Sequence, residues 1–228
     1  MKYLLLLLGA MGAWTSSPRS TLDQPAGFGS LIKPFTAMAY AAKHGYQYPE
    51  RVCTGAGCWL PRGHGRVGIR EALAHSCNFY FESLAAEVRS EEVIAVLQRF
   101  GISGLPEQVP AETLTGKGHA WRIPPEQMAR AYLELFARSG EPGVAELLDG
   151  MWLSGQEGTG RALGLPALIK TGTGPCFHGS HAPGDGYVMV LYPAGQPRAA
   201  LLLEAHGVPG AQAATAAGKL LRVELGLP

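Results

Sequence analysis

The sequence predicts an α+β fold in which a helical cluster packs against a small antiparallel sheet. Two regions of the 228-residue chain indicate this class. Residues 30–153 carry apolar side chains at helical spacing, whereas residues 167–205 hold three short strand-like runs joined by turns that contain Gly or Pro. Helices followed by neighbouring strands are typical of an α+β fold and not of alternating βαβ units.

The composition supports a packed domain and argues against one class of partner. Apolar residues make up 46% of the chain and charged residues 16%, which favours a hydrophobic core over disorder. The chain has 19 Lys and Arg against 18 Asp and Glu, a formal net charge of +1. Because nucleic-acid binding needs a surplus of positive charge on one face, we expect no nucleic-acid partner.

The first residues carry the longest apolar run of the chain. Lys2 precedes apolar residues 4–13, and Trp14 with the small polar residues 15–17 follows. This order is typical of a secretory signal, and the run is shorter than the roughly 20 residues that a membrane-spanning helix needs. A buried core helix is the alternative. The sequence therefore predicts a signal peptide over residues 1–18 and a domain over residues 19–228 that is exported.

The helices and strands follow from breakers and periodicity. Pro34 places the start of the first helix near residue 30, because proline is tolerated only in the first turn. A second helical region, residues 69–88, is interrupted at the polar residues around Cys77. The expected elements are helices at 30–42, 69–88, 91–100, 125–139, 146–153 and 209–225, strands at 167–173, 186–192 and 198–205, and loops at 55–68 and 101–121.

Four cysteines fit an exported protein. Cys53 and Cys58 are five residues apart with two glycines between them, so we expect them to form a disulfide in an oxidising compartment. A metal site is the alternative at another place in the chain, where four residues with ligand atoms cluster: Cys176, His178, His181 and Asp185. Because their spacing matches no familiar zinc motif, we expect neither a metal nor a cofactor.

Three short motifs occur in a fixed order and point to a serine nucleophile. They are Ser30-Leu31-Ile32-Lys33, Ser76-Cys77-Asn78 and Lys170-Thr171-Gly172-Thr173. The first two are weak signals by themselves, whereas Lys-Thr-Gly-Thr at the end of a strand is rare. Together, in this order, they indicate the nucleophile system of penicillin-recognising acyltransferases.

The spacing of the first motif suits nucleophilic catalysis. A serine hydroxyl needs a neighbouring base, and residues three apart on a helix share one face, so Lys33 is the candidate base for Ser30. A lysine acts as a base only when burial or other cations lower its pKa, and Lys170 is expected to supply such a charge. The start of the helix and the backbone N–H groups of Ser30 and Thr173 are expected to stabilise an oxyanion.

The other two motifs supply the remaining roles. Ser76 is expected to relay a proton between the lysines and the leaving group, and Asn78 to bind a substrate amide. Lys170, Thr171 and Thr173 are expected to hold a substrate carboxylate, with Gly172 between them as part of the binding strand. The predicted catalytic residues are therefore Ser30, Lys33, Ser76, Asn78 and Lys170, and the predicted substrate-binding residues are Thr171, Gly172 and Thr173.

The chain resembles the transpeptidase domain of penicillin-binding proteins over about residues 27–205. Besides the three motifs, the similarity includes residues 28–36, 58–59, 63–65, 72–81, 116–118, 124–129 and 158–160. The resemblance implies a β-lactamase/transpeptidase-like fold and a location in the periplasm or on the outer face of the bacterial cytoplasmic membrane. It also implies acyl transfer on peptidoglycan stem peptides that end in D-Ala-D-Ala, through an acyl-enzyme that β-lactams mimic.

Two departures from the family qualify this expectation. In the family, sheet strands precede the nucleophile helix, whereas only 29 residues precede Ser30 here. We therefore expect a sheet that lacks the family's leading strands, and self-association or a cell-wall protein partner that covers its exposed edge. Lys117 also replaces the usual Gln, and Arg122-Ile123-Pro124 replaces the usual Val-Thr-Pro.

Two other functions compete with a D,D-transpeptidase or D,D-carboxypeptidase. A non-catalytic or partner-dependent scaffold would keep the fold without turnover. A serine β-lactamase would share Ser30 and the Lys-Thr-Gly motif, but it needs a group that activates the deacylating water. The chain shows no clear Glu-x-x-x-Asn element for that purpose, so the β-lactamase is the less favoured alternative.

Overall fold

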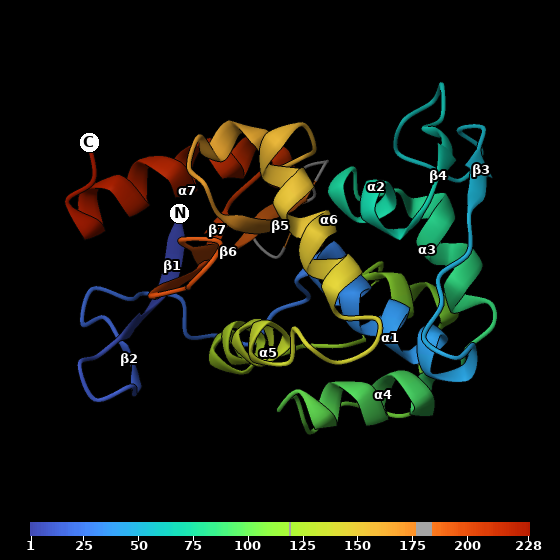
Figure 1. Ribbon diagram of the computed structural model, residues 1–228, viewed down its shortest axis with the longest axis horizontal. Coiled ribbons are helices and arrows are strands. Elements are labelled where there is room, and N and C mark those ends of the chain that lie inside the picture. The colour runs from blue at the N-terminus through green and yellow to red at the C-terminus, as the bar shows by residue number, and fades with distance from the viewer. Residues whose placement is uncertain (119, 177–183) are drawn as a thin grey trace.

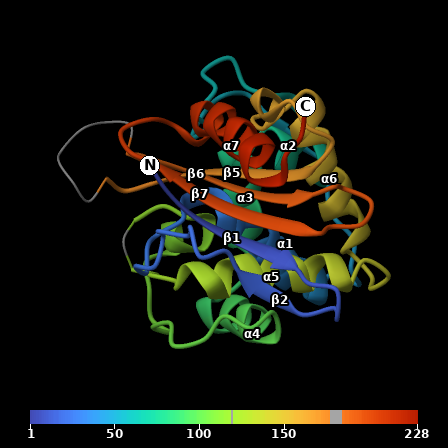
Figure 2. The ribbon, with the colours of Figure 1, turned by 90° about the vertical axis from the view of Figure 1, so that its left-hand side faces the viewer.

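A five-stranded antiparallel sheet divides the molecule into two layers of helices (Figures 1 and 2). The computed structural model describes residues 1–118, 120–176 and 184–228. The strands are β1 (Lys2–Leu8), β2 (Trp14–Ser16), β5 (Leu168–Gly174), β6 (Asp185–Tyr192) and β7 (Ala199–Ala205), in the order β2-β1-β7-β6-β5. The strands predicted at 167–173 and 198–205 correspond to β5 and β7, and both pair with β6 antiparallel.

Both faces of the sheet are buried, because successive side chains of each strand point to opposite faces. One face packs against α7 (Gly210–Leu225), and Figure 2 shows this helix running across the sheet. Its apolar residues are Leu5, Ile169, Val188, Val190, Leu201 and Leu203. The other face packs against the helical cluster through Leu4, Leu6, Leu168, Met189, Leu191 and Leu202.

The helical cluster follows the predicted order closely. A 3-10 turn, Gly29–Ile32, leads into α1 (Lys33–Lys43). The predicted region 69–88 is broken into two helices, as expected from the residues around Cys77. The cluster contains α2 (Ile69–Ala74), α3 (Asn78–Ala85), α4 (Ser90–Arg99), α5 (Pro125–Ala137) and α6 (Ala145–Gln156), the short hairpin β3 (Arg51–Cys53) and β4 (Gly65–Val67), and 3-10 turns at Ala111–Thr115 and Arg161–Leu163.

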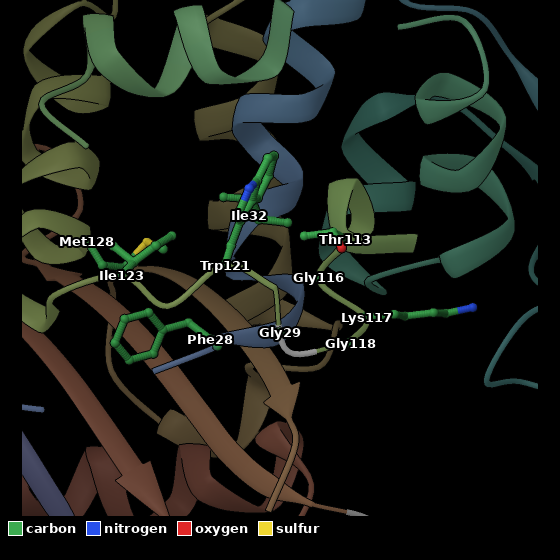
Figure 3. Close-up of a pocket in the computed structure, with 11 residues that line it drawn as sticks. Phe28, Gly29, Ile32, Thr113, Gly116, Lys117, Gly118, Trp121, Ile123 and Met128 are labelled. Atoms are coloured by element: carbon green, nitrogen blue, oxygen red, sulfur yellow. The ribbon is translucent and has the colours of Figure 1, made fainter. Parts of the chain in front are cut away.

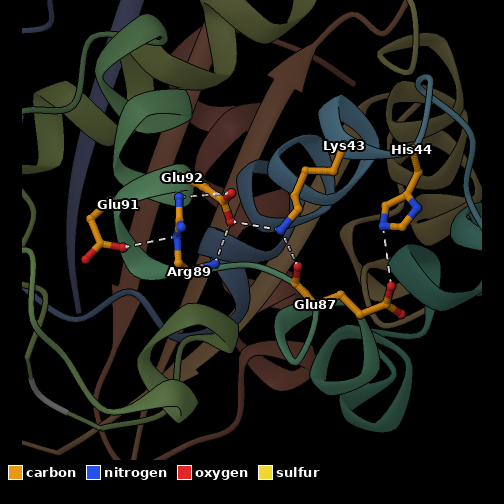
Figure 4. A network of polar contacts seen from close by, with 6 residues as sticks. All are labelled: Lys43, His44, Glu87, Arg89, Glu91 and Glu92. Atoms are coloured by element: carbon orange, nitrogen blue, oxygen red, sulfur yellow. Dashed lines mark hydrogen bonds and ion pairs between the residues drawn. The ribbon is translucent and has the colours of Figure 1, made fainter.

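A polar network joins the end of α1 to the start of α4 (Figure 4). The Nζ of Lys43 donates to the carbonyl of Glu87 at 2.8 Å and to Glu92 at 3.3 Å. Glu92 also accepts the backbone N–H of Arg89 at 2.7 Å, which satisfies one free donor at the start of α4. Exposed ion pairs contribute about 0–1 kcal/mol each, so this network orients α4, and burial of its apolar face supplies most of the stability.

The sheet departs from the prediction at the N-terminus. Residues 2–8 form strand β1 between β7 and β2, and Leu4, Leu5 and Leu6 are buried. The expectation of a sheet without leading strands is therefore wrong, because β1 and β2 both precede the turn of Ser30. Both strands lie within residues 1–18, the segment for which the sequence predicts a signal peptide. A continuous apolar run of this length suits a signal or a strand buried on both faces equally well.

The added strands extend the sheet on one side only. β7 pairs with β1 in register, with Leu5 opposite Leu201, whereas β5, which carries residues 170–173, stays at the edge of the described sheet. None of the described helices is long and apolar enough to cross a membrane.

The structure predicts that the first strand is essential to stability. Leu5→Ala is expected to lower the free energy of unfolding by about 2–5 kcal/mol, because the fully buried side chain would leave a cavity. Met11→Ala is the matched control, since Met11 is 97% exposed. Chemical denaturation of both variants provides the measurement. Equal stability of the two variants would show that β1 does not belong to the folded domain.

Candidate active site

The turn that carries Ser30 lies directly against the end of β5. Gly29 has a φ of +57°, and a Cβ at this position would lie 2.3 Å from the carbonyl oxygen of Thr173. On the other side, a Cβ at Gly172 would lie 2.3 Å from the carbonyl oxygen of Phe28. The two glycines thus allow backbone-to-backbone contact. This contact brings the backbone of Thr173 beside Ser30, as an oxyanion site formed by the two residues requires.

Lys33 is fully buried at the start of α1 and faces the second motif. Its Nζ donates to the carbonyl of Ser76 at 2.9 Å, to the Oγ of Ser76 at 3.3 Å and to the Oδ1 of Asn78 at 2.8 Å. Within the described residues, no hydrogen bond joins Lys33 to the hydroxyl of Ser30. Catalytic hydrogen bonds often form only when substrate is bound, so this geometry is compatible with Lys33 as the base.

Ser76 connects the two buried lysines. It lies between α2 and α3 with a φ of +51°, a left-handed conformation that costs a non-glycine residue about 1–3 kcal/mol. Its Oγ accepts from Lys170 at 2.9 Å as well as from Lys33. The strained backbone thus holds one hydroxyl between two amines, which is the geometry that a proton relay needs.

Strand β5 carries the third motif into the same site. The Nζ of Lys170 also donates to the carbonyl of Thr171 at 2.6 Å, and the hydroxyl of Thr171 donates to that of Thr159 at 2.6 Å. The hydroxyl of Thr173 accepts the backbone N–H of Gly210 at 3.1 Å, at the start of α7. The structure therefore brings together all eight residues that the sequence predicts for the site.

Burial shifts the pKa values of both lysines. Removal from water lowers the pKa of Lys33 to about 7, so a substantial fraction of its amine is neutral near neutral pH. Burial, followed by the charge of Lys33, lowers the pKa of Lys170 well below its usual value. The sequence suggested that the charge of Lys170 would activate Lys33. In the structure, burial is the largest cause of the lowered pKa at both lysines.

If Ser30 is the nucleophile, as the sequence predicts, this pKa determines how its acylation depends on pH. Only the neutral amine of Lys33 accepts a proton, so acylation by a β-lactam is expected to fall about tenfold per pH unit below pH 7 and to level off above it. Stopped-flow rates between pH 5 and 9, with the melting temperature followed over the same range, provide the measurement. A rate that stays constant from pH 5 to 9 would exclude Lys33 as the base.

The motif residues face a cavity of about 430 Å³. It is lined by Ser30, Trp59, Ser76, Asn78, Thr115, Gly116, Lys117, Thr159, Thr171, Gly172, Thr173, Pro209 and Ala211. Lys33 and Lys170 do not line it and lie behind Ser76. A cavity of this size with a few polar groups at one wall suits a small peptide or ligand.

A smaller apolar pocket lies beside the turn that carries Ser30 (Figure 3). Phe28, Ile123 and Met128 line it, and its volume of about 20 Å³ leaves little room for a ligand. Lys117 extends away from these apolar side chains and forms an ion pair with Glu82 on α3. The residue that departs from the family pattern thus lies at the rim of the larger cavity with its charge partly neutralised.

Sequence reasoning left two contributors out of the site. Thr159 hydrogen-bonds both Thr171 and the carbonyl of Ala74, and so links β5 to the end of α2. The segment Gly158-Thr159-Gly160, which is similar to the family, could have pointed to Thr159 as a residue of the site. Trp59 is half exposed at the cavity wall, and its indole N–H donates to the carbonyl of His75 at 3.1 Å. No spacing in the sequence predicts that contact.

The cysteines differ from the prediction. All four lie in the described part of the chain and are free thiols, so Cys53 and Cys58 form no disulfide. The alternative metal site was expected at Cys176, His178, His181 and Asp185. His178 and His181 lie outside the described residues. Asp185 lies near Glu204 and His206. A second group with suitable ligand atoms consists of Cys53, Cys58, His64 and Cys77.

Comparison with known proteins identifies the family of the chain. The family model of the penicillin binding protein transpeptidase domain matches residues 13–221. The fold is similar to PBP2 of Pseudomonas aeruginosa, with a TM-score of 0.73 at 16% identity over 99% of this chain and 74% of that chain. PBP2 of Helicobacter pylori, in a complex with MreC, gives a TM-score of 0.72 at 15% identity, over 100% of this chain and 61% of that chain.

A third structure, the transpeptidase domain of Burkholderia pseudomallei penicillin-binding protein 3, gives a TM-score of 0.69 at 17% identity, with 100% of this chain and 89% of that chain covered. A search of the curated proteins finds no match. The likeness to solved structures shows the fold, and the family model covers most of the chain. The chain therefore belongs to the penicillin-binding protein transpeptidase domain family.

Proposed function

We propose that the protein is a serine D,D-acyltransferase of peptidoglycan synthesis, a transpeptidase or carboxypeptidase that acts on stem peptides ending in D-Ala-D-Ala. The observation that carries the proposal is the buried hydrogen-bonded group of Lys33, Ser76 and Lys170 next to the turn of Ser30. Two buried amines on one hydroxyl have little structural value, because unpaired buried charges are costly. They are useful where a proton must be accepted and returned.

In this proposal Ser30 forms the acyl-enzyme. Its Oγ attacks the carbonyl carbon between the two D-Ala residues while the neutral amine of Lys33 accepts the hydroxyl proton. The N–H groups of Ser30 and Thr173 stabilise the oxyanion. The C–N bond then breaks, and D-Ala leaves with a proton delivered through Ser76. Attack by an acceptor amine gives a cross-link and attack by water gives hydrolysis, and both regenerate the hydroxyl of Ser30.

Substrate binding falls to the residues of the cavity wall. Thr173 lines the cavity, and because its hydroxyl only accepts a hydrogen bond, from Gly210, its own proton is free for the terminal carboxylate, whereas Thr171 lines the cavity but donates to Thr159. Lys170 is fully buried, so it does not contact the carboxylate directly and acts through Ser76. Asn78, the last residue of the second motif, also lines the cavity. In the proposal its side chain binds a backbone amide of the stem peptide.

The location and partners follow from the proposed substrate. A stem-peptide enzyme works in the periplasm or on the outer face of the cytoplasmic membrane. The chain spans 56% and 61% of the length of two similar chains, one from a peptidoglycan synthase complex and one from a complex with MreC. Because both of those chains were solved in complexes with other proteins, we include a cell-wall protein partner in the proposal.

Labelling with a fluorescent penicillin tests the proposed activity. A label that persists on the chain for many minutes supports the transpeptidase class, because such enzymes deacylate slowly. Rapid loss of the label with turnover of the drug would favour a β-lactamase. Failure of any label to form, in a chain shown to be folded by its cooperative melt, would favour the non-catalytic scaffold and overturn the proposal.

A further inference from the structure

Three cysteines and one histidine converge beside the second motif. Cys53 ends β3, Cys58 and His64 lie in the loop between β3 and β4, and Cys77 directly precedes α3. The four ligand atoms all lie within 4.8 Å of one another. They belong to two segments of the chain, residues 53–64 and the start of α3.

The distances match a tetrahedral metal site. Zinc binds sulfur at about 2.3 Å and nitrogen at about 2.0–2.1 Å, so neighbouring ligand atoms of a tetrahedron lie about 3.6–3.8 Å apart. The Nδ1 of His64 lies 3.7 Å from the Sγ of Cys53 and 3.5 Å from that of Cys58. The sulfurs of Cys58 and Cys77 are 3.8 Å apart. Three of the spacings therefore agree with one ion at the centre.

The loop is folded so that its ligands converge. Gly55 has a φ of +100°, and a Cβ there would lie 2.0 Å from the carbonyl oxygen of Pro61. Gly63 has a φ of +72°, and a Cβ there would lie 2.2 Å from the carbonyl oxygen of Cys53. Both glycines bring the two halves of the loop into backbone contact, which turns Cys53, Cys58 and His64 toward one point.

The surroundings suit metal ligands. The ring of His64 stacks on that of His75 at 5.7 Å and meets Trp59 edge-on at 5.4 Å. These contacts fix the ring with Nδ1 toward the sulfurs.

We propose that Cys53, Cys58, His64 and Cys77 bind one zinc ion, which fastens the β3–β4 loop to the second catalytic motif. Cys77 lies between Ser76 and Asn78, so the ion would hold the backbone on both sides of it. Ser76 is in a strained left-handed conformation that persists only when its surroundings enforce it. The four ligands are positioning residues in this proposal, because none of them touches the reacting atoms.

Metal binding itself does not depend on the proposed activity, whereas the effect on acylation rests on it. The test uses the whole chain purified under reducing conditions. Mass-spectrometric metal analysis is expected to find about one zinc per chain in the wild type and in Cys176→Ser, a control at a cysteine outside the cluster. Cys58→Ser is expected to bind zinc at least roughly tenfold more weakly.

A spectroscopic measurement keeps the test valid if Cys58→Ser does not fold. Wild-type protein refilled with Co²⁺ is expected to show the visible absorption of tetrahedral cobalt and a thiolate-to-cobalt charge-transfer band. Removal of the metal with a chelator is expected to lower the acylation rate at least fivefold, and added zinc to restore it. An unchanged acylation rate would overturn the positioning role.

Two further outcomes separate this proposal from the proposed function. A chain that labels with penicillin but takes up neither zinc nor cobalt, or that contains a disulfide among Cys53, Cys58 and Cys77 by peptide mapping, overturns the metal site. A chain that binds one zinc with the tetrahedral spectrum but never labels supports the metal site and overturns the acyltransferase.

Discussion

Ser30→Ala is expected to abolish covalent labelling by a β-lactam, with a fall in the acylation rate of at least about 10⁴-fold. The side chain lost is the only hydroxyl in the turn Gly29–Ile32, and it lies at the wall of the cavity beside the backbone of Thr173. Without it no ester bond can form, whereas the buried lysines and the cavity remain. Intact-mass spectrometry of wild type and variant after incubation with the drug measures the adduct directly.

Ser139→Ala serves as the control for this experiment, because Ser139 is exposed after α5 and far along the chain from all three motifs. It should label as fast as the wild type. An adduct of unchanged mass on Ser30→Ala would place the nucleophile elsewhere, and the digest would then identify the labelled residue.

Lys33→Arg is expected to slow acylation by about 10²–10⁴-fold even though the positive charge is retained. Guanidinium stays protonated at every accessible pH and cannot accept the proton of Ser30. The amine of Lys33, by contrast, has its pKa lowered to about 7 by burial. Single-turnover labelling at pH 8, where the wild-type amine is mostly neutral, gives the largest expected difference.

Lys43→Arg is the matched control, since it makes the same change on the same helix at an exposed position. Its labelling rate should equal that of the wild type. If Lys33→Arg labels within a few-fold of the wild type while remaining folded, the base lies elsewhere, and Lys170, acting through Ser76, becomes the candidate.

Much of the fold and most of the site could be predicted from the sequence, because they depend on local signals. Pro34 marks the start of α1, and the polar residues around Cys77 mark the break between α2 and α3. The order of the three motifs predicts Ser30 and its partners before any contact is known. Even so, the hydroxyl of Ser76 between two buried amines is visible only in three dimensions.

The sequence alone could not place the first strand. An apolar run at residues 4–13 satisfies the pattern of a signal, and its pairing with β7 is a contact between the two ends of the chain. The same difficulty applies to Cys77, which the sequence shows only as the middle residue of a motif. Its approach to Cys58 depends on how the loop at Gly55 and Gly63 folds back.

The most direct test of the central claim is the mass of the chain after rapid quenching with a synthetic peptide that ends in D-Ala-D-Ala. The proposal predicts a species heavier than the free chain by the mass of the peptide less one D-Ala, located on the peptide that contains Ser30, together with free D-Ala in solution. A folded chain that shows neither the adduct nor released D-Ala would contradict the proposal.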